Sequence, residues 1–132
     1  MKRAVLGGLA ARIITGVGGG EAIAQGLEAA SLDDVREPVP RAFRIFAERT
    51  GGDLKALAAC MRAGRIKITA EELATIRLPV LVVAGEEDEV AGSVAELVNI
   101  IPGSRGVVLP ARNHMNAVGD KQYKQAVVEF LR

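Results

Sequence analysis

The segment LPVLVVAG, residues 78–85, constrains the fold more than any other part of the sequence. It is a β-branched apolar run that a proline introduces and a glycine ends. Such a run is typical of a buried strand. A buried strand of this composition belongs in an α/β domain if helices alternate with strands around it, so its neighbours decide the fold class.

The neighbouring segments supply that alternation. A helix is expected over 93–101, where a serine and a glutamate three residues later form a capping box, and a short apolar strand is expected over 106–110. Residues 120–132 form an amphipathic pattern, and residues 4–10, AVLGGLA, lack the polar alternation of a half-exposed strand. Because the connections are short, the pattern predicts a three-stranded parallel sheet with crossover helices.

The region between the first two strands is different in character. It is a mosaic in which apolar residues recur at intervals of three and four, interrupted by Gly, Pro and Asp. The spacing predicts short helices within 21–30, 40–50 and 53–64, and a capping box from Thr69 to Glu72 begins another.

Composition excludes several classes of function. The 17 basic and 16 acidic side chains give a net charge of +1, so no charge pattern favours nucleic acid or an anionic membrane. The single cysteine, Cys60, rules out an internal disulfide and is expected to be a small buried helix residue. We find no apolar run long enough to span a membrane and no convincing secretion signal, and we expect a soluble cytoplasmic chain.

Two segments suggest a cofactor or a metal but lack the required pattern. The glycine-rich TGVGGGE, residues 15–21, has Glu21 where the dinucleotide fingerprint needs its third glycine, and an acidic residue there would repel a pyrophosphate. The acidic GEEDE, residues 85–89, has only one histidine to accompany it in the whole sequence. We therefore predict no cofactor and no metal, and interpret both segments as loops.

Asp88 and His114 are the candidate catalytic residues. Each follows a predicted strand, and catalytic groups of open α/β sheets gather where the strands end. A carboxylate bonded to the Nδ1–H of the histidine would fix its tautomer, so that Nε2 could take a proton from a nucleophile. The alternative is that His114 is a loop residue that makes a single hydrogen bond.

The same residues carry a resemblance to a known family. The sequence from LPVLVVAGEED through RNHMNAVGDKQYKQAVVEFL resembles the C-terminal third of an α/β-hydrolase of the esterase, lipase and haloperoxidase-like kind. The strand-then-G-x-x-D pattern of that family falls on Gly85 to Asp88, the triad acid, and its strand-then-N-H pattern falls on Asn113 and His114, the triad base. KRAVLGGLA resembles the family's sixth strand. The resemblance implies a partial hydrolase core of residues 1–15 and 77–132, a helical cap over 16–76, and ester or acyl hydrolysis by a Ser-His-Asp mechanism.

The nucleophile of that mechanism is missing. The family places it in a G-x-S-x-G elbow upstream of the sixth strand, and the sequence has no such motif. None of the three serines, Ser31, Ser93 and Ser104, stands in a suitable pattern. We expect the chain to be inactive alone, as a truncated or partial hydrolase. Two alternatives stay open: a non-catalytic self-associating module derived from a hydrolase, and an enzyme that uses only Asp88 and His114 to activate water.

The resemblance also makes a prediction about partners. The family's fifth strand pairs with its sixth, so residues 4–10 would present an unpaired, apolar edge. We expect this edge to bind a second copy, most simply by antiparallel pairing in a two-fold dimer, or a complementing N-terminal hydrolase segment. A small-molecule ester would be the substrate only of the completed site.

Overall fold

The computed structural model describes residues 2–16, 18–64 and 67–132. The chain divides into two compact units: a sheet unit of residues 1–17 and 67–132, and a helical unit of residues 18–66. The helical unit is shorter than the insertion of 16–76 that we expected. Residues 67–76 lie in the sheet unit because Leu73 is buried in its core, with Ile68 and Ile76 packed beside it.

The sheet has three parallel strands, as the sequence predicts. They are β1 (Ala4–Gly7), β2 (Val80–Gly85) and β3 (Arg105–Leu109), in the order β1-β2-β3. Val83 in the central strand is level with Gly7 on one side and with Val107 on the other. All six residues of β2 are buried, as the unbroken apolar run requires.

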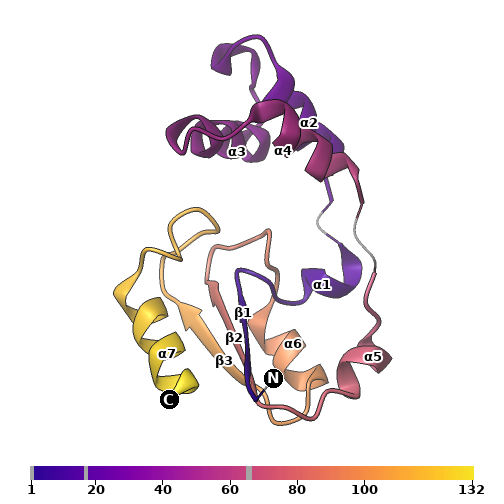
Figure 1. The fold of residues 1–132 in the computed structure, drawn as a ribbon, viewed down its shortest axis with the longest axis vertical. Coiled ribbons are helices and arrows are strands. Elements are labelled where there is room, and N and C mark those ends of the chain that lie inside the picture. Colours follow the sequence, from indigo (N-terminus) through magenta and orange to yellow (C-terminus); the bar gives the residue numbers. More distant parts are fainter. Residues whose placement is uncertain (1, 17, 65–66) are drawn as a thin grey trace. The chain divides into compact units, whose positions relative to one another are not determined.

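Helices cover both faces of this sheet. Figure 1 shows α6 on one side of the strands and α7 on the other. The helices of the sheet unit are α1 (Arg12–Thr15), α5 (Ala70–Ala74), α6 (Val94–Ile100) and α7 (Lys121–Leu131). The predicted crossover helix and closing helix are thus confirmed, each within one residue or two of its expected bounds.

The alternation of β2 assigns its side chains to two cores. Val82 and its even-numbered neighbours pack with Leu97 of α6, whereas Leu81 and Val83 pack against the face that α7 covers with Tyr123. Two buried layers on one strand fix its register, since a shift by one residue would exchange every side chain between them.

The first strand is shorter and more exposed than the sequence suggests. We predicted a strand over 4–10 that is buried on both faces, but β1 ends at Gly7 and none of its four residues is fully buried. Gly8 has a φ of 63°, which ends the extended conformation. The partial exposure has a second cause: among the strands that the structure describes, β1 lies at the edge of the sheet and pairs with β2 alone.

The helical unit contains the three helices expected there. They are α2 (Gly20–Glu28), α3 (Pro38–Arg49) and α4 (Leu54–Arg62), with a short 3-10 helix over Leu32–Asp34. Ile23 and Leu27 of α2 pack against Ala47 and Ala58 in an aliphatic core. One buried cation is part of this core: the Arg44 side chain donates to the carbonyl oxygens at the end of α2 (Gly26, Leu27 and Ala29).

Cys60 does not lie in that core. We predicted a buried helix residue, but Cys60 is exposed, because Ala58 is the only fully buried residue of α4. The apolar spacing identified the helix correctly but not which of its small residues face the core.

Within the described ranges, no helix is both long and apolar enough to cross a membrane.

Candidate functional site

The site lies where the carboxyl ends of the three strands meet, and it is built from three loops. The loop after β1 is bonded to the loop after β2, since the amides of Ala10 and Arg12 both donate to the carbonyl of Ala91 at 3.0 Å. The loop after β2 is bonded to the loop after β3, since the amide of Glu87 donates to the carbonyl of Arg112 at 2.9 Å. Backbone hydrogen bonds alone therefore connect the three loops.

Asp88 is held within the second loop. Its Oδ1 accepts the amide of Ala91 at 2.8 Å, and its carbonyl accepts the amide of Gly92 at 3.2 Å. Its side chain has no exposed surface, which is unusual for a carboxylate and requires polar partners. The backbone amide supplies one of those partners and orients the carboxylate.

His114 supplies the other partner. Its Nδ1 lies 3.0 Å from Oδ2 and 3.1 Å from Oδ1 of Asp88, and 30% of its side chain is exposed. If the carboxylate is ionised, it only accepts hydrogen bonds; Nδ1 is then the donor, and in the neutral ring Nε2 is the nitrogen that can take up a proton. The structure thus brings together the two predicted site residues, which lie 26 positions apart in the sequence.

Two glycines make this meeting of loops possible. A Cβ built on Gly85 would lie 1.9 Å from the carbonyl oxygen of Arg112, so only glycine lets the third loop approach the end of β2. A Cβ built on Gly8 would lie 3.2 Å from Cε1 of His114, so the ring is seated against the end of β1. Sequence analysis placed Gly85 in its motif but missed Gly8, for which the glycine pair inside the first apolar run was the only signal.

The loop that carries His114 is also closed by an ion pair. Nε of Arg112 lies 2.7 Å from Oδ2 of Asp120, whose Oδ1 accepts the amide of Gln122 as the N-cap of α7. The Arg112 guanidinium and the Gln122 amide together hold the pKa of Asp120 below its usual value. The ion pair therefore joins the start of the loop to the helix that follows it.

The serines are engaged in local structure. Ser93 accepts the amide of Glu96 as the N-cap of α6, Ser31 donates to Asp34, and Ser104 donates to the carbonyls of Val98 and Ile101. Each of these partners lies within six residues of the serine. That none of them is an elbow nucleophile stays a prediction from the sequence.

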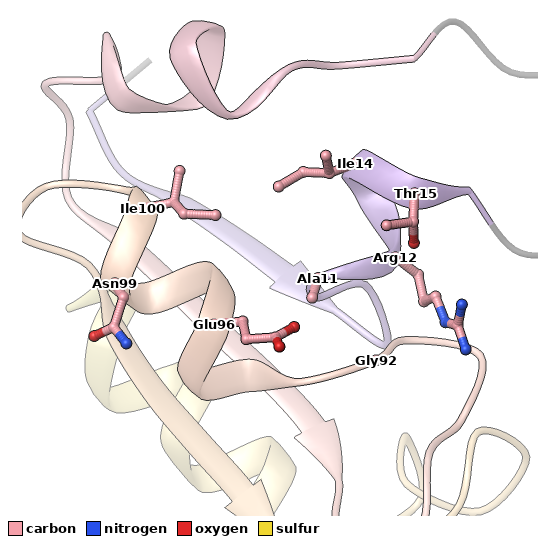
Figure 2. Close-up of a pocket in the computed structure, with 8 residues that line it drawn as sticks. All are labelled: Ala11, Arg12, Ile14, Thr15, Gly92, Glu96, Asn99 and Ile100. Atoms are coloured by element: carbon pink, nitrogen blue, oxygen red, sulfur yellow. The ribbon is translucent and has the colours of Figure 1, made fainter.

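A cavity of about 510 Å³ lies between α1 and α6 (Figure 2). Its walls are formed by side chains and backbone of mixed polarity, from Ala11, Arg12, Ile14, Thr15, Gly92, Glu96, Asn99 and Ile100. Neither Asp88 nor His114 lines it, so it is separate from the acid–histidine pair.

Comparisons with solved structures give consistent matches over nearly the whole chain. A hydrolase from Pseudomonas aeruginosa is 30% identical, with a TM-score of 0.68, over 98% of this chain and 55% of that one. An enol-lactonase from Burkholderia xenovorans is 24% identical with a TM-score of 0.66, over 99% of this chain and 56% of that one. An esterase from Exiguobacterium antarcticum is 18% identical with a TM-score of 0.67, over 98% and 57%.

The chain therefore spans just over half the length of the structures it matches. At 18% and 24% identity, the esterase and the lactonase are similar to it in fold alone. A scan against models of protein families and a search of curated proteins found no match to the sequence.

Proposed function

We propose that this chain, which has part of the α/β-hydrolase fold, contributes the acid and the histidine of a Ser-His-Asp site that hydrolyses carboxylic esters or related acyl bonds. The observation that carries the proposal is the contact of 3.0 Å between Asp88 and His114 at the carboxyl edge of a parallel sheet. The names of the structures that it matches, among them an esterase and an enol-lactonase, support the same class of substrate.

In a Ser-His-Asp mechanism, the acid and the histidine have different roles. Asp88 would hold the ring with Nδ1 protonated and would stabilise the imidazolium once it forms. His114 would take the proton of the attacking group at Nε2 and return it to the leaving group. Acid and histidine alone give a poor catalyst, because the acyl-enzyme route also needs a nucleophile and oxyanion-hole donors. The isolated chain is therefore expected to turn over activated esters very slowly or not at all.

The edge of β1 is the place where such a nucleophile would be supplied. The amides of Ala4 and Gly8 donate to carbonyls of Pro79 and Val83 in or beside β2, so by alternation the backbone groups of Val5 point to the other side. A complementing hydrolase segment that paired there would place the end of its own strand beside Gly8 and His114.

The same edge supports a second candidate function, a non-catalytic module that associates with copies of itself. An unprotected edge strand with apolar side chains favours pairing with another chain. In this case two β1 strands would pair antiparallel about a two-fold axis.

A cytoplasmic location stays a prediction from the sequence.

A chimera tests the catalytic proposal. The part of the Pseudomonas aeruginosa hydrolase outside the matched region would be joined to this chain, and hydrolysis of p-nitrophenyl acetate would be compared with that of the intact hydrolase. We expect activity in the chimera and a loss of about a thousandfold or more on His114→Ala. The isolated chain should be nearly inactive in the same assay.

Cooperative thermal unfolding of each chimera establishes that it is folded, and Ser104→Ala is the matched control that should retain activity. The proposal fails if a folded chimera hydrolyses the ester equally well with and without His114. A burst of product from the isolated chain, abolished by Ser104→Ala or Ser31→Ala, would also overturn it, because it would reveal a nucleophile of a different kind.

A further inference from the structure

The turn that carries His114 is closed by the side chains at both of its ends. Oδ1 of Asn113 accepts the amides of Met115 and Asn116 at 2.9 and 3.2 Å. In return, Oδ1 of Asn116 accepts the amide of Asn113 at 2.8 Å. The amide of Ala117 also donates to the carbonyl of Asn113 at 3.1 Å. This reciprocal arrangement has the logic of a capping box, in which two side chains each bond the backbone of the other residue.

Helix capping does not explain the arrangement. The next helix, α7, begins at Lys121 and has its own N-cap in Asp120. The burial of polar groups does not explain it either, since Asn113 and Asn116 are both exposed and could bond water instead. These bonds fix the backbone of residues 113–117. The candidate catalytic residue His114 lies within that turn.

The fixed backbone decides where the ring lies. A contact of 3.0 Å between Nδ1 of His114 and Oδ2 of Asp88 tolerates little displacement, because hydrogen bonds weaken steeply with distance and angle. Asp88 is already anchored by the amide of Ala91, so the remaining freedom belongs to the histidine and its turn. A turn without the asparagine bonds would sample several conformations, and the ring would meet the carboxylate in only some of them.

We propose that Asn113 and Asn116 are positioning residues, which hold His114 against Asp88 through the backbone and make no bond to the carboxylate themselves. This inference rests on the proposed role of the Asp88–His114 pair. It adds to that role a reason for two exposed asparagines that flank the histidine.

The tautomer of His114 reports on this positioning directly, because His114 is the only histidine in the sequence. In the chain labelled with ¹⁵N-histidine, the shifts of the two ring nitrogens at the alkaline end of a pH series, where they no longer change with pH, distinguish Nδ1–H from Nε2–H. We expect the wild-type ring to be in the Nδ1–H form that Asp88 accepts. In Asn113→Ala and Asn116→Ala we expect the Nε2–H form, which an unconstrained imidazole favours, to become the major one.

Two further variants separate positioning from a general loss of structure. Asn113→Ser keeps an uncharged acceptor and should restore the Nδ1–H form in part. Asp53→Ala is the matched control. Oδ1 of Asp53 accepts the amides of Lys55 and Ala56, which are the same i+2 and i+3 bonds that Asn113 makes, but Asp53 belongs to the helical unit. This control should lose stability without changing the tautomer of His114.

The outcomes divide cleanly. If Asn113→Ala and Asn116→Ala unfold cooperatively and keep the wild-type tautomer, the positioning role is wrong. If Asn113→Ala does not fold, Asn116→Ala decides, since it removes a single bond. Asp88→Asn distinguishes the two levels of the account. If Asp88→Asn keeps the wild-type tautomer of His114, the proposed Asp88–His114 pair is wrong. If Asp88→Asn changes the tautomer but the asparagine variants do not, only the positioning role is wrong.

Discussion

Gly8, the residue that follows β1, lies against the ring of His114, and a Cβ built on it would be 3.2 Å from Cε1 and 3.5 Å from Nδ1. Gly8 also has a φ of 63°, a conformation that side chains rarely adopt. The contact joins the edge strand to the acid–histidine pair across more than a hundred residues of sequence. Any change at the end of β1 should therefore reach the histidine.

We predict that Gly8→Ala destabilises the sheet unit by about 1–2 kcal/mol and displaces the ring from Asp88. Urea unfolding would measure the first effect and the ¹⁵N spectrum of His114 the second. Gly103→Ala is the control, because Gly103 has a φ of 71° and no atom within 4 Å of the added Cβ. It should cost similar stability and leave the histidine spectrum unchanged. Equal spectral changes in both variants would contradict a direct contact.

The ion pair of Arg112 and Asp120 predicts a dependence of stability on pH. The pKa of Asp120 is lowered in the folded chain, so the unfolded chain binds a proton more readily. The stabilisation is present above the unfolded pKa and is lost as pH falls through the lower folded value, from about pH 4 downward. In Asp120→Asn, the free energy of unfolding measured in urea should therefore decrease less between pH 7 and pH 3 than in the wild type. Arg112→Gln should reduce this pH dependence as well. If neither substitution changes the pH dependence of the free energy of unfolding, the stabilising role of the ion pair is contradicted.

Much of the sheet unit could be predicted because its signals are local. The unbroken apolar run at 80–85 requires burial on both faces, and the capping box from Thr69 to Glu72 has both of its expected bonds. The proximity of Asp88 and His114 could also be predicted, because each follows a strand and parallel strands bring their carboxyl ends together.

What could not be predicted depends on contacts between distant segments. Nothing local to Cys60 indicates which face of α4 is buried, and nothing local to residues 67–76 indicates that they pack on the sheet. The length of β1 depends on how the chain turns at Gly8, and the role of that turn depends on a ring that lies far along the sequence. These features required the structure.

Arg44 predicts a specific weakness of the helical unit. Only about 6% of this residue is exposed, and its guanidinium donates to three carbonyl oxygens at the end of α2 and pairs with Glu48 at 2.6 Å. Arg44→Met keeps the volume but leaves those carbonyls without a donor, which should cost at least about 2 kcal/mol. Hydrogen exchange of amides within 18–64 would measure the loss. Arg49→Met, an exposed position on the same helix, should have little effect, and equal losses in the two variants would contradict the role of the buried cation.

The free edge of β1 predicts self-association of the isolated chain. Sedimentation over a range of concentrations should show dimers at high micromolar chain. Val5→Pro removes an outward-facing amide without removing a bond to β2, so it should shift the equilibrium toward monomer while thermal unfolding stays cooperative. A folded wild-type chain that remains monomeric throughout would show that this edge is not an interface between copies.

The central claim is that Asp88 fixes the protonation of His114, and the ¹⁵N spectrum of the single histidine tests it most directly. Spectra of the wild-type chain and of Asp88→Asn would be compared at the alkaline end of a pH series, where the shifts no longer change with pH, with far-UV circular dichroism showing that both are folded. We predict the Nδ1–H form in the wild type and a shift toward the Nε2–H form in Asp88→Asn, because the amide holds the ring less strongly than the carboxylate. The same tautomer populations in both folded proteins would contradict the claim.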